Sequence, residues 1–252
     1  MSYTNSYTPT RDLAIPPTYG LDPYDINFVF PLPHTLFENS LIKLTPFIPR
    51  IHAEPYLSQI TKYPEIYRYY PYQQFTLDEF LPWVEGFIRR DKGNIMFAII
   101  DKTREGEEGA LAGTIGLFKT SAEHLTTEIA TLIIFPPFQR THITSQATSL
   151  LLRWALDLPS DSPPGLGLRR VQWSTHPGNL ASRRAAERLG MKLEGLSRWT
   201  FALPIGAEEG KKSREGDPAE VRPGRDNVLY AICWDDWEGG VREVVRGMLI
   251  PN

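Results

Sequence analysis

The stretch TEIATLIIFPPFQRTHITSQATSLLLRWAL (127–156) combines a strand, a polar turn and a long helix in immediate succession. Its apolar beginning is typical of a strand, and Pro136 and Pro137 end that strand because proline cannot donate a ladder hydrogen bond. The helix is predicted to begin near Ile143, since apolar residues then recur at helical spacing along one stripe. The stripe consists of Ile143, Ala147, Leu150, Leu151, Trp154 and Leu158.

A second stretch, RRVQWSTHPGNLASRRAAERLGMKLEG (169–195), has the same order of strand and helix. The segment 169–175 is predicted to be the strand. Asn179 is a suitable N-cap, because its side chain can accept a hydrogen bond from a free amide of the first turn. Gly190 is a suitable residue to close the helix, because glycine readily adopts the left-handed conformation that this position needs.

The rest of the chain contains further strands and helices. Thr76, with Glu79 three residues later, forms a capping-box pattern, so the segment 76–92 is predicted to be a helix. The segment GALAGTIG (109–116) lacks the glycine spacing of a dinucleotide fingerprint, and we interpret it as part of a hairpin. The other predicted strands are 41–47, 95–101, 110–119, 192–203 and 227–234, and the other predicted helices are 52–61 and the C-terminal tail.

The order of these elements leaves no interval large enough for a second domain. We therefore predict one α/β domain, residues 41–252, preceded by an extended arm, residues 1–40, that is rich in Tyr and Pro. The aromatic residues of the arm predict that it packs on the domain; they include Tyr19, Tyr24, Phe28 and Phe30. The segment 205–225 is charged and rich in Gly and Pro, and it is predicted to be a flexible surface insertion.

Composition narrows the class of protein. The 252 residues carry a net charge of −3, which gives no electrostatic footprint for nucleic acid. No window approaches the roughly 18 consecutive apolar residues of a membrane span, and the N-terminus lacks the pattern of a secretory signal. The single cysteine, Cys233, cannot form an intrachain disulfide, and it lacks zinc-ligand spacing to any histidine. We expect a cytoplasmic protein without a metal site, a nucleic-acid partner or membrane association.

Taken together, the two stretches resemble the acyl-coenzyme A binding core of the GNAT (Gcn5-related) N-acetyltransferase superfamily, and specifically its RimJ/RimL-like branch. The family pattern is Asn-x-x-Ser/Ala, a helix, a Gly-Phe/Met pair and Glu-Gly. The residues that match it are Asn179, Ser182, Leu189, Gly190, Met191, Glu194 and Gly195. The segment DNVLYAICWDDW (226–237) is similar to the closing strand of that branch, with Asp226 and Trp237 at positions of its Arg-Asp and Glu-Trp pairs.

The resemblance implies a fold, a donor and a cofactor site. The fold is a mixed central sheet of about seven strands, with helices on both faces and with strands four and five splayed. The donor is acetyl-coenzyme A, whose pyrophosphate would meet the free amides at the start of the helix that follows QRTHIT (139–144). His142 and Thr144 stand where glycine and a small residue are usual in the family, and the alternative is an ordinary polar helix start with Thr141 as its cap. The implied cofactor-binding residues are Ile133, Ile134, Phe135, Gln139, Arg140, Thr141, His142, Ile143, Thr144, Asn179, Ser182 and Arg183.

The resemblance also implies two catalytic residues. An alkylamine with a pKa near about 10.4 must lose a proton before it attacks, and Glu128 lies where several GNAT enzymes place a carboxylate base. Ser182 lies where RimJ/RimL-like enzymes have a serine proposed to protonate the leaving sulfur, and RRAAERLG contains no tyrosine for that role. The alternatives are an exposed glutamate at a strand end and a helix serine without a catalytic duty. Transfer in the family is direct, so Cys233 is expected to be a core residue and not a nucleophile.

The acceptor wall is predicted to lie in the aromatic run YPEIYRYYPYQQF (63–75), with Tyr67, Tyr69, Tyr70 and Tyr72 as substrate-binding candidates and 205–225 over its rim. The function that follows is acetyl-CoA-dependent N-acetyl transfer to a primary amine of a small molecule or a protein N-terminus, by a monomer or homodimer. The alternative is a catalytically degenerate acyl-CoA-binding protein that acts as a sensor or interaction module.

Overall fold

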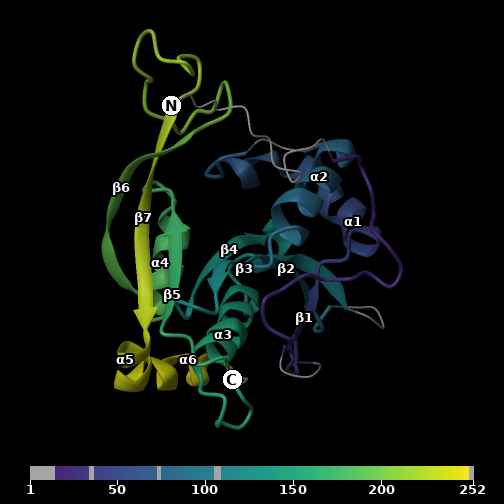
Figure 1. Ribbon diagram of the computed structural model, residues 1–252, viewed down its shortest axis with the longest axis vertical. Helices are drawn as coiled ribbons and strands as arrows, with labels where there is room; N and C mark the ends of the chain where they lie inside the picture. Colours follow the sequence, from purple (N-terminus) through teal and green to yellow (C-terminus); the bar gives the residue numbers. More distant parts are fainter. Residues whose placement is uncertain (1–14, 34–36, 73–74, 105–108, 250–252) are drawn as a thin grey trace, which may run out of the picture.

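The structure, a computed structural model, describes residues 15–33, 37–72, 75–104 and 109–249. Seven strands form one sheet in the order β1-β2-β3-β4-β5-β7-β6 (Figure 1). They are β1 (Ile42–Pro46), β2 (Ile95–Asp101), β3 (Ala110–Ser121), β4 (Thr126–Ile134), β5 (Arg170–Thr175), β6 (Lys192–Ala202) and β7 (Gly224–Cys233). Every neighbouring pair is antiparallel except β4 and β5, which are parallel. The predicted mixed sheet of seven strands is confirmed.

Helices cover both faces of the sheet. On one face, the α1–α2 side, α1 (Pro49–Lys62) and α2 (Leu77–Trp83) pack on the strands, and a π-helical turn (Val84–Arg89) extends α2. On the other, the α3–α4 side, lie α3 (Ile143–Leu156) and α4 (Leu180–Arg188). The short elements are η2 (Pro64–Tyr67), η4 (Pro136–Phe138), α5 (Trp234–Asp236), a second π-helical turn (Trp237–Val241) and α6 (Arg242–Leu249). No helix in the described ranges is long and apolar enough to cross a membrane.

The predicted helix starts and ends are observed, with one extension. The Thr76 amide donates to Glu79 Oε2 at 2.8 Å, which is half of the predicted capping box. Gly190 closes α4 with a φ of +83°. The first helix begins at Pro49 instead of residue 52, because proline suits the first helical position, where no amide donor is needed.

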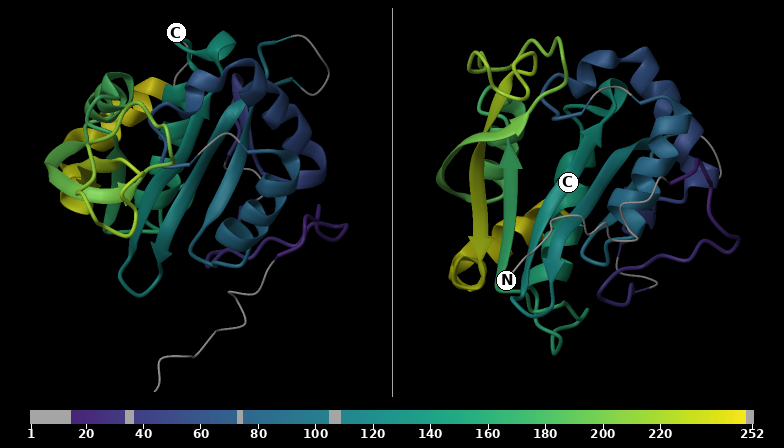
Figure 2. Two further views of the ribbon diagram at one scale, coloured as in Figure 1. Left: turned by 90° about the horizontal axis from the view of Figure 1, so that it is seen from above. Right: turned by 45° about the horizontal axis from the view of Figure 1, so that its top comes forward.

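Strands β4 and β5 pair only at their beginnings. Residues 126–129 of β4 pair with residues 170–173 of β5, and beyond Ile129 and Trp173 the two strands separate. Figure 2 shows the consequence, which is that the strands β1–β4 diverge from β5, β7 and β6 toward one end of the sheet. We call this divergence the β4–β5 fork. It confirms the predicted splay of strands four and five.

A one-residue bulge lies on β4 at the fork. Thr114 pairs with Ile133 and Gly116 pairs with Ala130, so β4 has one residue more than β3 across this interval. The extra residue falls at Thr131, whose φ of 47° is in the left-handed region that few non-glycine residues adopt. The bulge bends β4 at the point where its pairing with β5 ends.

The N-terminal arm and the 205–225 insertion also contact the rest of the domain. In the arm, Phe28 lies 6.1 Å from Trp154 between ring centroids, and the Tyr19 hydroxyl donates to Glu54 at 2.9 Å. The base of the 205–225 insertion is closed by a pair of 2.8 Å backbone hydrogen bonds between Lys211 and Gly224. Because of this pairing β7 begins at Gly224, three residues before the predicted start at residue 227.

Candidate active site

The fork exposes backbone groups of β4 that no strand pairs. The Phe135 amide bonds to the Ala112 carbonyl of β3 at 2.9 Å, so the polar groups of Ile134, next in the alternation, point away from β3. Two carbonyls on that side already have partners. Tyr70 Oη donates to the Leu132 carbonyl at 2.8 Å, and Gln139 Nε2 donates to the Ile134 carbonyl at 3.0 Å. The amide of Ile134 therefore faces the fork with its carbonyl held in place.

Ile133 and Phe135 are positioned differently from Ile134. Their side chains are buried in the core of the α1–α2 side, with 4% and 0% exposure. Their backbone groups point toward β3. Of the three predicted residues on this strand, Ile134 is the one whose amide can reach a ligand in the fork.

The first turn of α3 follows β4 and offers free amides. Ile143 begins the helix, and its amide is 3.4 Å from Thr141 Oγ1. The amides of Thr144 and Ser145 have no carbonyl acceptor within the helix, because the residues four positions before them lie outside it. Arg140 has a φ of 60°, a left-handed conformation that costs a non-glycine residue about 1 kcal/mol and often marks a functional turn.

His142, which departs from the family pattern, and its neighbour Thr141 are oriented by contacts within the protein. His142 Nε2 lies 3.5 Å from Asp101 Oδ1, at the end of β2, so the imidazole turns away from the start of α3. The Thr141 hydroxyl donates to the Phe138 carbonyl at 2.6 Å. The side chain of His142 therefore does not cover the amides of the first turn, and the free amides of Thr144 and Ser145 suit an anion such as a pyrophosphate.

Ser182 lies in the first turn of α4 and is held by a buried tryptophan. The indole Nε1 of Trp173, a residue with 3% exposure, donates to Ser182 Oγ at 2.9 Å. The serine oxygen thus accepts one hydrogen bond and keeps its own proton to donate. This arrangement is suited to a general acid, because the indole fixes the hydroxyl oxygen without consuming its proton.

Asn179 and Arg183 are engaged within the protein. Asn179 Oδ1 accepts the Ser182 amide at 3.1 Å and so caps α4, as predicted. Arg183 Nε donates to the Tyr230 hydroxyl at 3.1 Å, and Nη1 donates to the Pro177 carbonyl at 3.3 Å. The side chain of Arg183 is therefore directed to β7 and to the loop before α4.

Glu128 lies on the α1–α2 side of the sheet, just before the fork. It exposes 7% of its surface, and Oε2 accepts hydrogen bonds from Lys119 Nζ at 2.7 Å and from Gln172 Nε2 at 2.9 Å. The exposed strand-end glutamate that the sequence left open as an alternative is thus not what the structure contains. Gln172, which orients the carboxylate, was not identified from the sequence; its signal is its alignment with Glu128 across the parallel pair.

Three of the four predicted substrate tyrosines, Tyr67, Tyr70 and Tyr72, pack together beside β4. Tyr67 is 7% exposed, its hydroxyl lies 2.8 Å from that of Tyr56, and burial raises its pKa to about 12. Tyr70 and Tyr72 lie beside it, with ring centroids 5.6 Å apart. Burial raises the pKa of both above the ordinary value, so both phenols stay protonated and can act as hydrogen-bond donors.

Tyr69 points away from β4, toward His176, which follows β5. Its ring stacks on His176, with centroids 5.3 Å apart. His176 Nδ1 accepts the Gly178 amide at 3.0 Å, so Nε2 carries the proton and donates it to the Glu209 carbonyl at 3.0 Å. Arg68 also pairs with the Glu209 carboxylate. The 205–225 insertion therefore lies against the aromatic run, as the prediction of a covered rim requires.

Two further polar residues of this region, Arg225 and Asn227, were not identified from the sequence. They lie on β7, and each exposes 6% of its surface. Arg225 Nε, Arg225 Nη1 and Asn227 Oδ1 are buried without a hydrogen-bond partner. The available signal was the position of Arg225 directly before Asp226, in the Arg-Asp pair of the RimJ/RimL-like closing strand.

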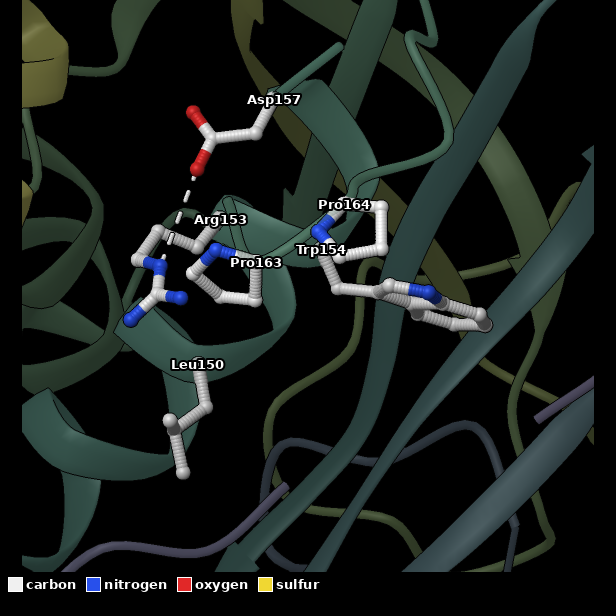
Figure 3. Close-up of a pocket in the computed structure, with 6 residues that line it drawn as sticks. All are labelled: Leu150, Arg153, Trp154, Asp157, Pro163 and Pro164. Carbon is white, nitrogen blue, oxygen red and sulfur yellow. Dashed lines mark ion pairs between the residues drawn. The ribbon is translucent and has the colours of Figure 1, made fainter. Parts of the chain in front are cut away.

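Two other features are less suited to a ligand. A cavity of about 10 Å³ lies at the C-terminal end of α3. Figure 3 shows the residues that line it, which are Leu150, Arg153, Trp154, Asp157, Pro163 and Pro164. That volume accommodates about one water molecule and lies at the opposite end of α3 from its free amides. Cys233, Asp235 and Asp236 have ligand atoms within 4.8 Å of one another, and the Asp236 carboxylate is paired with Lys192.

Comparison with known proteins agrees with this geometry. Residues 42–192 match the acetyltransferase (GNAT) domain family. The chain belongs to the GNAT acetyltransferases. A comparison with curated protein sequences finds no significant match.

Three solved structures illustrate the similarity of the fold. A GCN5-related N-acetyltransferase from Brucella melitensis has a TM-score of 0.67 at 22% identity, and 85% of each chain is covered. RimJ from Mycobacterium smegmatis, in complex with CoA-disulfide, has a TM-score of 0.59 at 15% identity, with 82% of this chain and 88% of that chain covered. The spermidine N-acetyltransferase from Vibrio cholerae, in complex with CoA and spermine, has a TM-score of 0.56 at 14% identity, with 79% and 99% covered. The predicted GNAT fold is confirmed, and RimJ is among the structures that share it.

Proposed function

We propose that this chain is an acetyl-CoA-dependent N-acetyltransferase that transfers the acetyl group directly to a primary amine. The observation that carries the proposal is the fork, where the Ile134 amide of β4 and the free amides of α3 lie on consecutive segments of a GNAT domain. Relatives of the same fold were solved with coenzyme A or its disulfide. The acceptor is an amine of a small molecule or of a protein N-terminus, because both offer the same reacting group, a primary amine, to the acyl donor.

The residues around the fork would hold the donor by backbone groups more than by side chains. The first turn of α3, with Arg140, Thr144 and Ser145, would bind the pyrophosphate. Gln139 would keep the turn fixed to β4 through the Ile134 carbonyl. When bound there, acetyl-CoA supplies an acetyl group as a reactive thioester.

Three groups of the chain would then serve the transfer. Glu128 would accept the proton that the amine loses when its nitrogen forms the new C–N bond. The Ile134 amide would donate to the oxygen on which negative charge develops. Ser182 would donate its proton to the sulfur as the C–S bond breaks, so that the products are an acetylated amine and a free thiol.

The proposal is tested by titrating acetyl-CoA into the protein calorimetrically and by measuring thiol release with a panel of primary amines. Saturable binding and amine-dependent thiol release are expected. Glu128→Gln should lower kcat by about 10²–10⁴-fold, the usual range for a general base, with unchanged affinity for acetyl-CoA. The control is Glu123→Gln, which removes an exposed carboxylate from the turn between β3 and β4. Absence of binding would overturn the proposal, and binding without release would favour the degenerate acyl-CoA-binding alternative.

A further inference from the structure

Arg225 is a buried cation that has no oppositely charged partner among the described residues. It exposes 6% of its surface, and neither Nε nor Nη1 has a hydrogen-bond partner. Burial of a charged guanidinium without a partner is costly, so such groups in native proteins usually have an ion, a water molecule or a ligand as partner. Desolvation lowers the pKa of Arg225, in agreement with an environment that does not compensate its charge.

Arg225 faces the same side of the sheet as Glu128. Val228, Tyr230 and Ile232 of β7 belong to the core of the α3–α4 side, so Arg225 and Asn227 alternate to the opposite face. Glu128 lies on that face too, because its neighbour Ile129 belongs to the α3–α4 core. Arg225 and Glu128 both act electrostatically on the Tyr72 phenol, so the unpaired cation and the proposed base both lie near this residue.

The acidic groups around Arg225 already have cationic partners. Glu128 pairs with Lys119, Glu209 pairs with Arg68, and Asp226 pairs with Lys211. His176, which also acts electrostatically on Arg225, is neutral because Nδ1 accepts the Gly178 amide. The groups that act electrostatically on Arg225 from the aromatic run are the neutral phenols of Tyr70 and Tyr72. Of these charged groups, Arg225 is therefore the one without an oppositely charged partner among the described residues.

The surroundings of Arg225 favour a small ligand. The guanidinium carbon lies 5.4 Å from the centroid of the Phe201 ring, a cation–π contact on one side of the cation. The 205–225 insertion closes over this end of β7 through Lys211 and Gly224. The same insertion is tied to the aromatic run through Glu209. A planar guanidinium whose donors have no partner is suited to two parallel hydrogen bonds with a carboxylate.

We propose that Arg225 binds a carboxylate of the acceptor, so that the substrate is a small zwitterion, an amino acid or a related amine that carries a carboxylate. The carboxylate pairs with Arg225 while the amine lies toward Glu128, and Asn227 adds a second polar group beside Arg225. This inference rests on the proposed acetyltransferase function. It also separates this chain from polyamine acetylation, because a buried unpaired cation repels an acceptor whose charges are all positive.

The experiment compares amino acids with their carboxamides, which keep the amine but lack the negative charge. The best amino acid is expected to exceed its amide in kcat/KM by about 10²-fold or more, since a site built to hydrogen-bond a group rejects the analogue that lacks it. Spermine is expected to be a poorer acceptor than either. Equal kcat/KM values for acid and amide, or a preference for spermine, would overturn the inference.

Variants at Arg225 test whether this residue causes the preference for a carboxylate. Arg225→Met should remove most of the preference through a higher acceptor KM, with the KM of acetyl-CoA changed less than about twofold, and Arg225→Lys should retain only part of it. Arg198→Met makes the same change at an exposed position on β6 and should leave the preference intact. If Arg225→Met instead raises only the KM of acetyl-CoA, Arg225 serves the donor and the inference is wrong.

A readout independent of turnover separates the two proposals. Amino acids are expected to raise the Tm of the wild-type protein, while their amides should not, and Arg225→Met should lose the shift. If no amine releases thiol but this pattern is observed, the proposed function fails and the carboxylate site stands. If thiol release occurs with amides as well as with acids, and no Tm shift distinguishes them, the function stands and the carboxylate site fails.

Discussion

The first turns of α3 and α4 each follow one of the two diverging strands, and they use their polar groups in opposite ways. At α4 the side chains serve the protein, since Asn179 caps the turn and Arg183 bonds to Tyr230 and Pro177. At α3 the His142 imidazole is directed to Asp101 and the Thr141 hydroxyl bonds to the Phe138 carbonyl. The amides of Thr144 and Ser145 are therefore left for a ligand.

The difference shows that regularity of a motif and contact with a ligand are separate properties. The α4 start matches the family pattern closely because each of its polar residues has a structural partner. The α3 start departs from the pattern at His142 and Thr144, but backbone amides are the same in every residue type. A substitution there is tolerated as long as its side chain is directed away from the amides, as the His142 imidazole is toward Asp101.

The largest expected effect concerns the one residue of α4 to which we assign chemistry. Ser182→Ala should lower kcat by about 10²-fold, because the departing sulfur loses its proton donor, and Ser182→Thr should restore much of the rate. Thiol release at saturating acetyl-CoA measures both. The alanine variant also leaves Trp173 Nε1 without its acceptor, so its Tm should fall as well. A reduced Tm with an unchanged kcat would show that Ser182 is structural, like its neighbours.

A matched pair of proline variants tests the two starts directly. Thr144→Pro and Ala181→Pro each remove the amide of the second residue of a helix, a position in the first turn where proline is tolerated. Thr144→Pro should weaken acetyl-CoA binding by about tenfold, the effect of one lost hydrogen bond to a charged group. Ala181→Pro should leave the affinity unchanged. Calorimetric titration measures both, and equal losses would abolish the distinction between the starts.

A smaller effect is expected for the cap of α4. Asn179→Ala should cost about 1 kcal/mol of stability, which in a chain of this size lowers the Tm by about 2–4 °C. The affinity for acetyl-CoA should not change, because Oδ1 is occupied by the Ser182 amide. Thermal unfolding and calorimetric titration are measured on the same preparation. A weaker affinity would mean that Asn179 also contacts the donor, as the family resemblance implies.

The smallest effect concerns the histidine before α4. Burial and the nearby Arg225 lower the pKa of His176 in the folded state, so the unfolded chain binds its proton more readily. Stability should therefore decline as the pH falls below the unfolded value of about 6.5, by at most about 1.4 kcal/mol per pH unit for one group. His52, whose pKa is lowered to about 4 by burial, contributes to the same slope.

The slope is measured by urea unfolding between pH 7 and pH 5. His176→Gln should make the decline shallower than in the wild type, whereas His124→Gln, at an exposed position in a turn, should not. A parallel decline in all three proteins would show that His176 stays hydrated in the folded state.

Much of the fold could be predicted from local signals. The capping box at Thr76, the paired prolines after β4 and the glycine at the end of α4 each act within a few residues, so their patterns are readable in the sequence. The start of β7 was predicted three residues too late, because its first residues pair with Lys211, in a segment that carries no strand pattern, and with the end of β6.

The candidate site depends on longer distances along the chain. His142 is directed by a carboxylate 41 positions earlier, and the isolation of Arg225 results from three ion pairs that draw residues from five separate segments. These partners lie between 9 and 141 positions apart in the sequence, so residue type and spacing could suggest the candidates but could not determine their orientation. For the same reason, the choice between the amides of Ile133 and Ile134 required the register of β3 and β4.

The bulge at Thr131 reverses which residues of β4 face each side of the sheet, and β4 contributes side chains to the hydrophobic cores on both sides. Ile129 and Ile133 are four residues apart and would share one face of a regular strand, yet Ile129 packs with α3 and Ile133 packs with α1 and α2. Deleting one residue at Thr131 would exchange the surroundings of residues 132–135 without altering their hydropathy. It would also turn the Ile134 amide into the sheet, where it would pair with β3 and could no longer serve a ligand.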